Sequence, residues 1–462
     1  MGFEAELKDA LVQDQRVKFI YLNNFEVEES WSDDHLIKLP QLTLGSGKTI
    51  VNRMEEMGIF LASSSDYIVL KDAIDPDYLQ ALRDHHFSIP HRIVLTQNNP
   101  EQTITENLLE DEETLSKLRE LGTKERVFFL PFGVSEAEEK LAEVTGIPLA
   151  TPSSSVFKKV NSKIYSRQLN EQLGLAQIRG INCESIDSLK QAFNELKPLL
   201  ADNRKLVLKD ALGVSGKGIV IIESERRFMQ TLKLLENRSK KANGNQKVAF
   251  VLEEWIDKVC DLNYQFLISR DGQVHFHFVK EALTHNGVHQ GHLIPSRLTA
   301  EQVTALAVIS KQIGEALYKD GYFGIVGVDA ILDQQNKIWP NLEINARFNM
   351  STYQTRIQEE RMTAEQVALV KQYPLKLKYA LSYQKIAAYL STYLYQVTSG
   401  KGFLICNFAT VNAAYIEEGK PFSGRLYGMI IAENVEELKR LDEEISYQLK
   451  QLLEEDQYAQ GV

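Results

Sequence analysis

Short apolar runs alternate with amphipathic stretches through the first third of the chain. The apolar runs of strand length are 18–22, 67–70, 91–95 and 127–130. Stretches with the spacing of a helix lie between them, as at 76–85 and 136–145. Strands that alternate with helices are typical of a parallel sheet. The pattern therefore predicts a small α/β domain over residues 1–150.

After residue 150 the predicted strands follow one another as hairpins. Residues 151–155 have the composition of a linker, and a helix is predicted from 161–163 to Gly174. The apolar runs that follow are 206–209, 219–222, 248–256, 264–269, 274–278, 325–332 and 338–346. A helix at 300–319, with Thr299 and Gln302 as a capping box, interrupts the series. This pattern predicts an α+β domain over residues 151–360.

Residues 361–462 form a third region with weaker signals. The spacing of apolar residues predicts helical structure over 366–395 and strands at 403–411 and 426–432. Residues 435–453 have the pattern of an amphipathic helix. We therefore predict a small C-terminal α+β domain, and a multidomain chain of α/β and α+β class.

Composition narrows the functional classes. The chain has 462 residues and a net charge of −11, which disfavours nucleic acid as a partner because phosphate binding needs a basic surface. No apolar run reaches the length of a membrane span, and the N-terminus lacks the pattern of a secretory signal. The three cysteines are far apart, which argues against a disulfide framework. We expect a cytoplasmic protein without a membrane or nucleic-acid partner.

Side chains on the second strand of the hairpin at 325–346 alternate between two faces. The apolar face carries Leu342, Ile344 and Ala346, which we expect to point toward a core. The polar face carries Glu343, Asn345 and Arg347.

Asp329 lies near the middle of the partner strand, so two carboxylates and an amide face one cleft. Hard oxygen ligands suit Mg²⁺, which leaves coordination positions for phosphate oxygens. Arg347 adds a planar guanidinium for a phosphoryl or carboxylate group. These residues predict a metal site of Asp329, Glu343 and Asn345 with Arg347 as a catalytic residue. The alternative is a set of ordinary surface charges on a sheet.

A glycine-rich loop joins the predicted strands 206–209 and 219–222. Because it joins strand to strand, it is neither a Rossmann fingerprint nor a P-loop, both of which precede a helix. A glycine hairpin can fold over phosphates and present backbone N–H groups to them. Its candidate phosphate-binding residues are Gly213, Ser215, Gly216, Lys217 and Gly218, together with Lys209 on the preceding strand and Lys163 upstream. A plain hairpin and solvated lysines are the alternatives.

The predicted strand at 248–256 ends in two glutamates and a tryptophan. Its end has the residues to present Glu253, Glu254 and the backbone of Trp255 and Ile256 to the hydrogen-bonding rim of adenine. Asp261 follows as a candidate for the ribose hydroxyls. Surface carboxylates are the alternative.

The segment 280–297 concentrates polar side chains among glycines. These side chains belong to Lys280, Glu281, His285, His289, His292 and Arg297. Polar loops commonly hold substrates. We therefore expect a substrate loop here, with Arg297 as a candidate catalytic residue.

The order of these motifs along the chain resembles that of the ATP-grasp superfamily. The motifs are a lysine, the strand-to-strand glycine loop, the Glu-Glu-Trp segment, and Asp329 with residues 343–347. The resemblance covers residues 150–360. It implies ATP and two Mg²⁺ ions, with Mn²⁺ as an alternative ion. It also implies phosphate binding by the lysines and the glycine loop, adenine binding by residues 253–256, and a role for Arg347 in steadying the transferred phosphoryl group.

The flanking regions resemble the subgroup with a pre-ATP-grasp domain, which includes the pheganomycin-type peptide ligases of natural product biosynthesis. The resemblance implies a ligase that activates a carboxylate as an acyl phosphate, releases ADP and phosphate, and forms a peptide bond. Amino acids or peptides would be its substrates, and a homodimer is one option. Two alternatives stay open, namely loading of an amino acid on an acyl-carrier-protein thiol, and ATP binding without catalysis.

Overall fold

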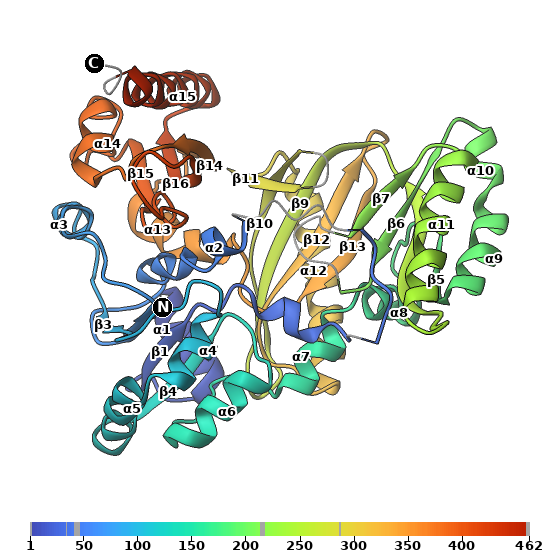
Figure 1. Ribbon diagram of the computed structural model, residues 1–462, viewed down its shortest axis with the longest axis horizontal. Helices are drawn as coiled ribbons and strands as arrows, with labels where there is room; N and C mark the ends of the chain where they lie inside the picture. Colours follow the sequence, from blue (N-terminus) through green and yellow to red (C-terminus); the bar gives the residue numbers. More distant parts are fainter. Residues whose placement is uncertain (1, 34, 41–46, 213–217, 286–287, 459–462) are drawn as a thin grey trace.

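A computed structural model describes residues 2–33, 35–40, 47–212, 218–285 and 288–458 (Figure 1). Within these ranges the strands form a four-stranded parallel sheet, a four-stranded antiparallel sheet and an eight-stranded antiparallel sheet. The mixed α/β and α+β class predicted from the sequence is confirmed.

The N-terminal sheet consists of parallel strands in the order β3-β2-β1-β4. The strands are β1 (Lys18–Leu22), β2 (Tyr67–Leu70), β3 (His91–Val94) and β4 (Val127–Pro131). The accompanying helices are α1 (Phe3–Val12), α3 (Pro76–Asp84), α4 (Ile104–Glu110), α5 (Glu112–Lys124) and α6 (Glu136–Thr145). Capping boxes begin α4 at Thr103 and α6 at Ser135, and so fix where these helices start.

Three short helices lie between β1 and β2 in the sequence. They are η1 (Val27–Trp31), α2 (Gly47–Val51) and η2 (Met54–Phe60). The ring of Phe25, just before η1, lies 4.7 Å from that of Phe132 and 5.3 Å from that of Tyr353. These contacts join the N-terminal region and the eight-stranded sheet in one hydrophobic core.

The second sheet has the strand order β5-β8-β6-β7. Its strands are β5 (Gly180–Ser185), β6 (Lys205–Asp210), β7 (Ile219–Ile222) and β8 (Lys247–Trp255). Its core is shared with α9 (Ile186–Leu196), α10 (Pro198–Ala201) and α11 (Glu225–Lys241) (Figure 1). Two helices precede it, α7 (Ser154–Val160) and α8 (Lys163–Leu173), and α8 is capped by Ser162 and Gly174, close to its predicted limits. The antiparallel pair β6 and β7 confirms a strand-to-strand connection at the glycine loop.

The eight-stranded sheet has the order β13-β12-β9-β10-β11-β14-β16-β15. Its strands are β9 (Lys258–Ile268), β10 (Val274–His285), β11 (Val288–Ile294), β12 (Gly324–Asp333), β13 (Ile338–Asn345), β14 (Val367–Leu377), β15 (Gly402–Asn407) and β16 (Phe422–Ala432). Its helices are α12 (Ala300–Lys319), η3 (Thr352–Gln354), α13 (Thr355–Arg361), α14 (Tyr383–Tyr389) and α15 (Val435–Tyr458). Because β14 pairs with β11, the sheet continues across residue 360 into the C-terminal region. The domain boundaries at 150 and 360 stay predictions.

The prediction of helical structure over 366–395 is wrong for its first part. Residues 367–377 form β14, which pairs with β16 along its whole length. Buried Tyr373, Leu375 and Leu377 alternate with exposed Pro374 and Lys376, which is the period of a strand with one buried face. Pairing with a distant strand therefore decided the conformation here.

An irregularity in β13 corrects a second prediction. Asp329 pairs with Glu343, but the next pair is Ile331 with Trp339, so residues 340–342 stand opposite residue 330 alone. The strict alternation of faces is lost at this point. Ile344 and Ala346 are fully buried as predicted, whereas Leu342 lines a cavity beside Glu343.

Candidate functional site

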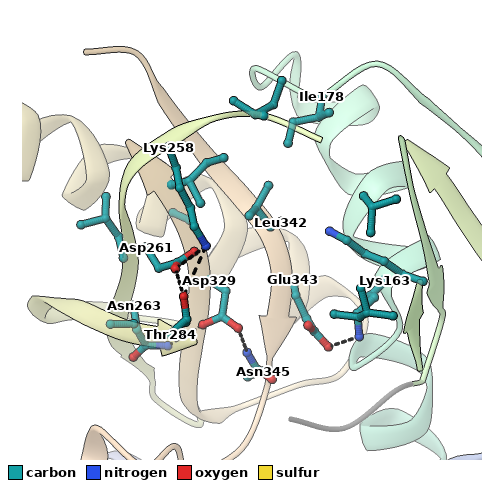
Figure 2. Close-up of a pocket in the computed structure, with 18 of the residues that line it drawn as sticks. Lys163, Ile178, Lys258, Asp261, Asn263, Thr284, Asp329, Leu342, Glu343 and Asn345 are labelled. Atoms are coloured by element: carbon teal, nitrogen blue, oxygen red, sulfur yellow. Dashed lines mark hydrogen bonds and ion pairs between the residues drawn. The ribbon is translucent and has the colours of Figure 1, made fainter. Parts of the chain in front are cut away.

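A cavity lies between the second sheet and the eight-stranded sheet (Figure 2). Its walls come from β6, β7 and β8 on one side and from β9, β10, β12 and β13 on the other. The predicted residues that line it are Lys163, Lys209, Glu253, Glu254, Trp255, Ile256, Asp261, Asp329, Glu343, Asn345 and Arg347. Folding thus brings together candidates that the sequence presents in separate segments.

Two carboxylates face each other across the hairpin of β12 and β13. Asp329 accepts hydrogen bonds from Asn263 Nδ2 at 2.9 Å and from Asn345 Nδ2 at 3.1 Å. Burial, and secondly the neighbouring Glu343, raise the pKa of Asp329 to about 6. A cation between the two carboxylates would relieve both effects.

Mg²⁺ fits this donor set. The described part of the chain holds no group of three or more His, Cys, Asp or Glu side chains that could bind a metal, so an ion here must also use amide oxygens. To reach an ion beside Asp329, the Asn345 amide oxygen would have to turn and give up the hydrogen bond that it accepts from Arg347 Nη2. Asp329, Glu343 and Asn345 would then hold the ion, and phosphate oxygens would complete its shell.

Lys163 contributes a positive charge next to these carboxylates. It is the first residue of α8, and its Nζ lies 2.6 Å from Glu343 Oε1. Its side chain is largely buried, and Figure 2 shows its contact with Glu343 in the cavity wall. A lysine at this point is suited to contact a phosphate that shares a metal ion with Glu343.

Glu253 has a different surrounding from the one predicted. Its carboxylate is buried and binds two cations, Lys209 Nζ at 2.6 Å and Arg167 Nη1 at 2.8 Å. Its backbone lies in β8 between β5 and β6. The geometry therefore gives the Glu253 side chain the task of orienting Lys209 toward the cavity, and contact with adenine stays a prediction.

The remaining adenine and ribose candidates lie at the end of β8 and the start of β9. Glu254 forms an ion pair with Arg204, and Ile256 lies just beyond the last residue of β8. The carboxylate of Asp261 accepts hydrogen bonds from Lys258 and Thr284, as Figure 2 shows. A ribose hydroxyl would have to share Asp261 with these two donors.

Arg347 is held on several sides. Its Nε donates to Glu28 Oε1 at 2.7 Å, and its Nη2 donates to Asn345 Oδ1 at 2.8 Å. Its Nη1 donates to the backbone oxygen of Phe348 at 2.9 Å. The guanidinium is thus fixed next to the candidate metal ligands.

Of the glycine-loop candidates, only Gly218 lies in the described part of the chain, and it is not among the residues that line the cavity. Gly213, Ser215, Gly216 and Lys217 lie outside the described residues. Gly218 has φ +76°, and a Cβ there would come 2.3 Å from the Asp210 carboxylate, so this position requires glycine.

Arg297 is not among the residues that line the cavity, although its partner Glu281 directly precedes the lining residue Ala282. It is half exposed and forms two hydrogen bonds with the Glu281 carboxylate, at 2.7 and 2.6 Å. The structure thus does not bring it together with Arg347 and Lys209.

Several lining residues had no signal in the sequence. Arg167 contacts Glu253 but does not line the cavity, and it also had no signal in the sequence. The lining residues concerned are Glu28, Asn263, Thr284 and Ser351. Their roles depend on contacts between distant segments, such as the hydrogen bond from Ser351 Oγ to Asn263 Oδ1 at 2.7 Å. His292 also lines the cavity, and the sequence predicts it only as part of a polar loop.

No helix in the described ranges is long and apolar enough to cross a lipid bilayer. Two family models match the chain, a pre ATP-grasp domain at residues 54–147 and an ATP-grasp domain at 168–362. A curated relative is the butirosin acyl-carrier protein L-glutamate ligase of Niallia circulans. It is 28% identical over 337 residues, which cover 72% of each chain.

Solved structures share the fold at low identity. The ADP complex of N5-carboxyaminoimidazole ribonucleotide synthetase has a TM-score of 0.55 and 14% identity, and the match covers 87% of this chain and 95% of that one. A complex of biotin carboxylase from Campylobacter jejuni has a TM-score of 0.54 and 12% identity, with 89% and 95% covered. With both matching models, the chain belongs to the ATP-grasp superfamily and carries a pre-ATP-grasp domain ahead of its ATP-grasp domain.

Proposed function

We propose that this protein is an ATP-dependent carboxylate–amine ligase that forms a peptide bond through an acyl phosphate. One observation carries the proposal. The neighbouring carboxylates of Asp329 and Glu343 share a cavity with cationic side chains, among them those of Lys163, Lys209 and Arg347. This arrangement suits a reaction in which phosphate charge develops and moves.

In the proposed reaction, a substrate carboxylate oxygen attacks the γ-phosphorus of ATP. The bond from that phosphorus to the β-phosphate oxygen breaks, and ADP leaves with the electron pair. An amine nitrogen then attacks the acyl carbon and loses a proton, and the bond from that carbon to the phosphate oxygen breaks to release phosphate.

The side chains contribute position and charge. Lys163 and Lys209 would bind nucleotide phosphates, and Arg347 would face the transferred phosphoryl group. Mg²⁺ held by Asp329, Glu343 and Asn345 would neutralise phosphate charge. Adenine would lie against Trp255 and Ile256 beside Glu253 and Glu254, with Asp261 near the ribose, and the loop at 213–218 would cover the phosphates. Arg297 remains a proposed catalytic residue in the segment expected to hold the substrate.

A second candidate is transfer of the acyl group to the thiol of an acyl-carrier protein. It is favoured by the relative from Niallia circulans, which is named for this activity. A run of exposed basic side chains could attract an acidic carrier; it consists of Arg238, Lys240 and Lys241 near the end of α11 and Lys247 at the start of β8.

The test is an assay of nucleotide products. Purified protein would be incubated with MgATP, pooled amino acids and hydroxylamine, with Mn²⁺ in a parallel reaction, and the products identified by mass spectrometry. We expect ADP together with the hydroxamate of one acid. AMP would contradict the acyl-phosphate mechanism, and ATP that is bound but never hydrolysed would favour the non-catalytic alternative.

A further inference from the structure

A carboxylate from the N-terminal region holds the arginine assigned to the phosphoryl group. Glu28 Oε1 lies 2.7 Å from Arg347 Nε and 2.6 Å from its Nη2, although the two residues are 319 positions apart. The Glu28 side chain is 14% exposed and that of Arg347 12%, and both line the cavity. Glu28 is therefore part of the wall of the candidate active site.

The other contacts of Arg347 come mostly from its own segment. Nη1 and Nη2 donate to Phe348 O and Asn345 Oδ1, and the guanidinium carbon lies 5.0 Å from the centre of the Phe132 ring. Within the described residues, Glu28 is the one acidic side chain in an ion pair with Arg347. An anionic substrate group would therefore approach this guanidinium by sharing or replacing Glu28.

Glu28 is held firmly at this place. It lies in η1, whose last residue, Trp31, donates from Nε1 to Val134 O at 2.7 Å. Asn24 Nδ2, just before η1, donates to Gly133 O at 2.9 Å. Both anchors attach η1 to the segment after β4. The carboxylate of Glu28 thus belongs to a fixed backbone and remains near Arg347 when the arginine changes partner.

This change of partner has an electrostatic consequence. Once an anionic group binds Arg347 in place of Glu28, the poorly exposed Glu28 carboxylate loses its cationic partner. A largely buried carboxylate without a partner destabilises the complex. A positively charged group on the second substrate would restore the balance.

We propose that Glu28 binds the ammonium group of the acceptor amino acid or peptide, accepts the proton that this group must lose before its nitrogen attacks, and so selects an amine as the acceptor. The inference rests on the proposed ligase function and specifies its second substrate. It assigns the N-terminal region, ahead of the segment that matches the pre-ATP-grasp model, a direct part in substrate recognition. An acceptor without a positive charge gains nothing from this carboxylate.

The test compares two acceptors in wild type and in Glu28→Gln. The amide keeps the size of the side chain and an oxygen for Arg347, but removes the charge. The acceptors are pooled amino acids, which carry an ammonium group, and hydroxylamine, which is uncharged at neutral pH. We expect the ratio of peptide to hydroxamate formation to fall at least tenfold in Glu28→Gln, with a raised KM for the amino acid.

Three controls make the result specific. Glu29→Gln removes a neighbouring exposed charge and should leave the ratio as in wild type. Glu28→Asp keeps the charge and should recover part of the ratio. Melting temperatures of all variants report on folding.

An unchanged ratio in Glu28→Gln would overturn the inference, even if both rates fall, because Glu28 would then act only by orienting Arg347. If wild type yields neither ADP nor hydroxamate, the proposed ligase function fails first, and the inference fails with it. The two failures are therefore distinguishable.

Discussion

The surroundings of two aspartates on β12 shift their pKa values in opposite directions. Burial and then Glu343 raise the pKa of Asp329 to about 6, so its charged form is less stable than that of an ordinary aspartate, and a bound cation would relieve this cost. Asp333 is also buried, which opposes ionisation, but hydrogen bonds from Lys337 N and Trp339 outweigh this and lower its pKa. One carboxylate is thus suited to bind a ligand, and the other stabilises a turn.

Replacing each of these two aspartates by asparagine tests the two roles separately. At pH 7.5, Asp329→Asn should reduce ADP release by on the order of 100-fold or more and leave the melting temperature of the ligand-free protein unchanged or higher. Asp333→Asn should cost about 1–2 kcal/mol of stability, because the turn loses a charged acceptor, with activity retained in the folded fraction. Scanning calorimetry and the ADP assay check both. A large loss of stability in Asp329→Asn would contradict this division of roles.

Adjacent glutamates at the end of β8 provide a second prediction. Glu253 is buried between Lys209 and Arg167, whereas Glu254 pairs with Arg204, whose side chain is 45% exposed. Glu253→Gln should lower stability by about 3 kcal/mol, because two cations lose a buried partner, and should raise the KM for ATP through misplacement of Lys209. Glu254→Gln should cost less than about 1 kcal/mol. Urea unfolding of both variants measures the difference, and equal costs would count against it.

At the scale of elements, the irregularity in β13 decides which side chains reach the cavity. Leu342 lines the cavity, whereas Ile344, two residues later, is completely buried in the core. Leu342→Ala should raise the KM for ATP several-fold with little loss of stability. Ile344→Ala should cost about 2–5 kcal/mol. The comparison needs only thermal melts and ATP saturation curves. Similar stability losses in the two variants would mean that Leu342 belongs to the core.

The elements also show how far local pattern determines this fold. The limits of α6 and α12 and the pairing of β12 with β13 follow from caps and periodicity within a few residues. The sequence likewise places Asp329 near Glu343, because a hairpin brings neighbours together. The pattern failed at β14, where pairing with β16 prevailed, and at Leu342, where an irregular register moved a side chain to the other face. Both failures depend on partners outside the local window.

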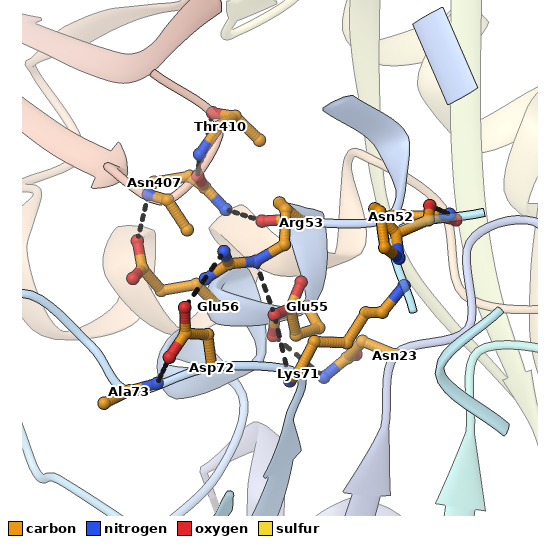
Figure 3. Close-up of polar contacts among 12 residues, drawn as sticks. Asn23, Asn52, Arg53, Glu55, Glu56, Lys71, Asp72, Ala73, Asn407 and Thr410 are labelled. Carbon is orange, nitrogen blue, oxygen red and sulfur yellow. Dashed lines mark hydrogen bonds and ion pairs between the residues drawn. The ribbon is translucent and has the colours of Figure 1, made fainter. Parts of the chain in front are cut away.

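At the scale of the whole molecule, the site depends on contacts between regions that are far apart in sequence. Glu28 meets Arg347, and Tyr353 donates to Asn23 Oδ1 at 2.7 Å. The C-terminal region is attached to the N-terminal region by similar contacts. Asn407 Nδ2, at the end of β15, donates to Arg53 O at 3.2 Å, next to a buried Glu56 (Figure 3). No periodicity or motif could have predicted these pairs.

Glu56 makes this junction sensitive to pH. Its Oε1 accepts hydrogen bonds from the backbone of Phe408 at 2.6 Å and Ala409 at 3.1 Å, yet burial raises its pKa to about 7. Because the folded pKa lies above the unfolded value near 4.5, the stabilising contribution is complete below pH 4.5 and is lost as pH rises through 7. The full effect is on the order of 3 kcal/mol.

Wild-type protein should therefore melt at a lower temperature at pH 8 than at pH 5.5, and Glu56→Gln should lose part of this dependence because the amide stays neutral and keeps an oxygen for both N–H groups. Burial also raises the pKa of Glu26 to about 7, so Glu26 should account for a further part of the pH dependence. Scanning calorimetry between pH 5.5 and 8 measures the slopes, with the exposed Glu101→Gln as control. If Glu56→Gln keeps the wild-type slope, the carboxyl is not neutral in the folded protein, and the junction is held by the charged form.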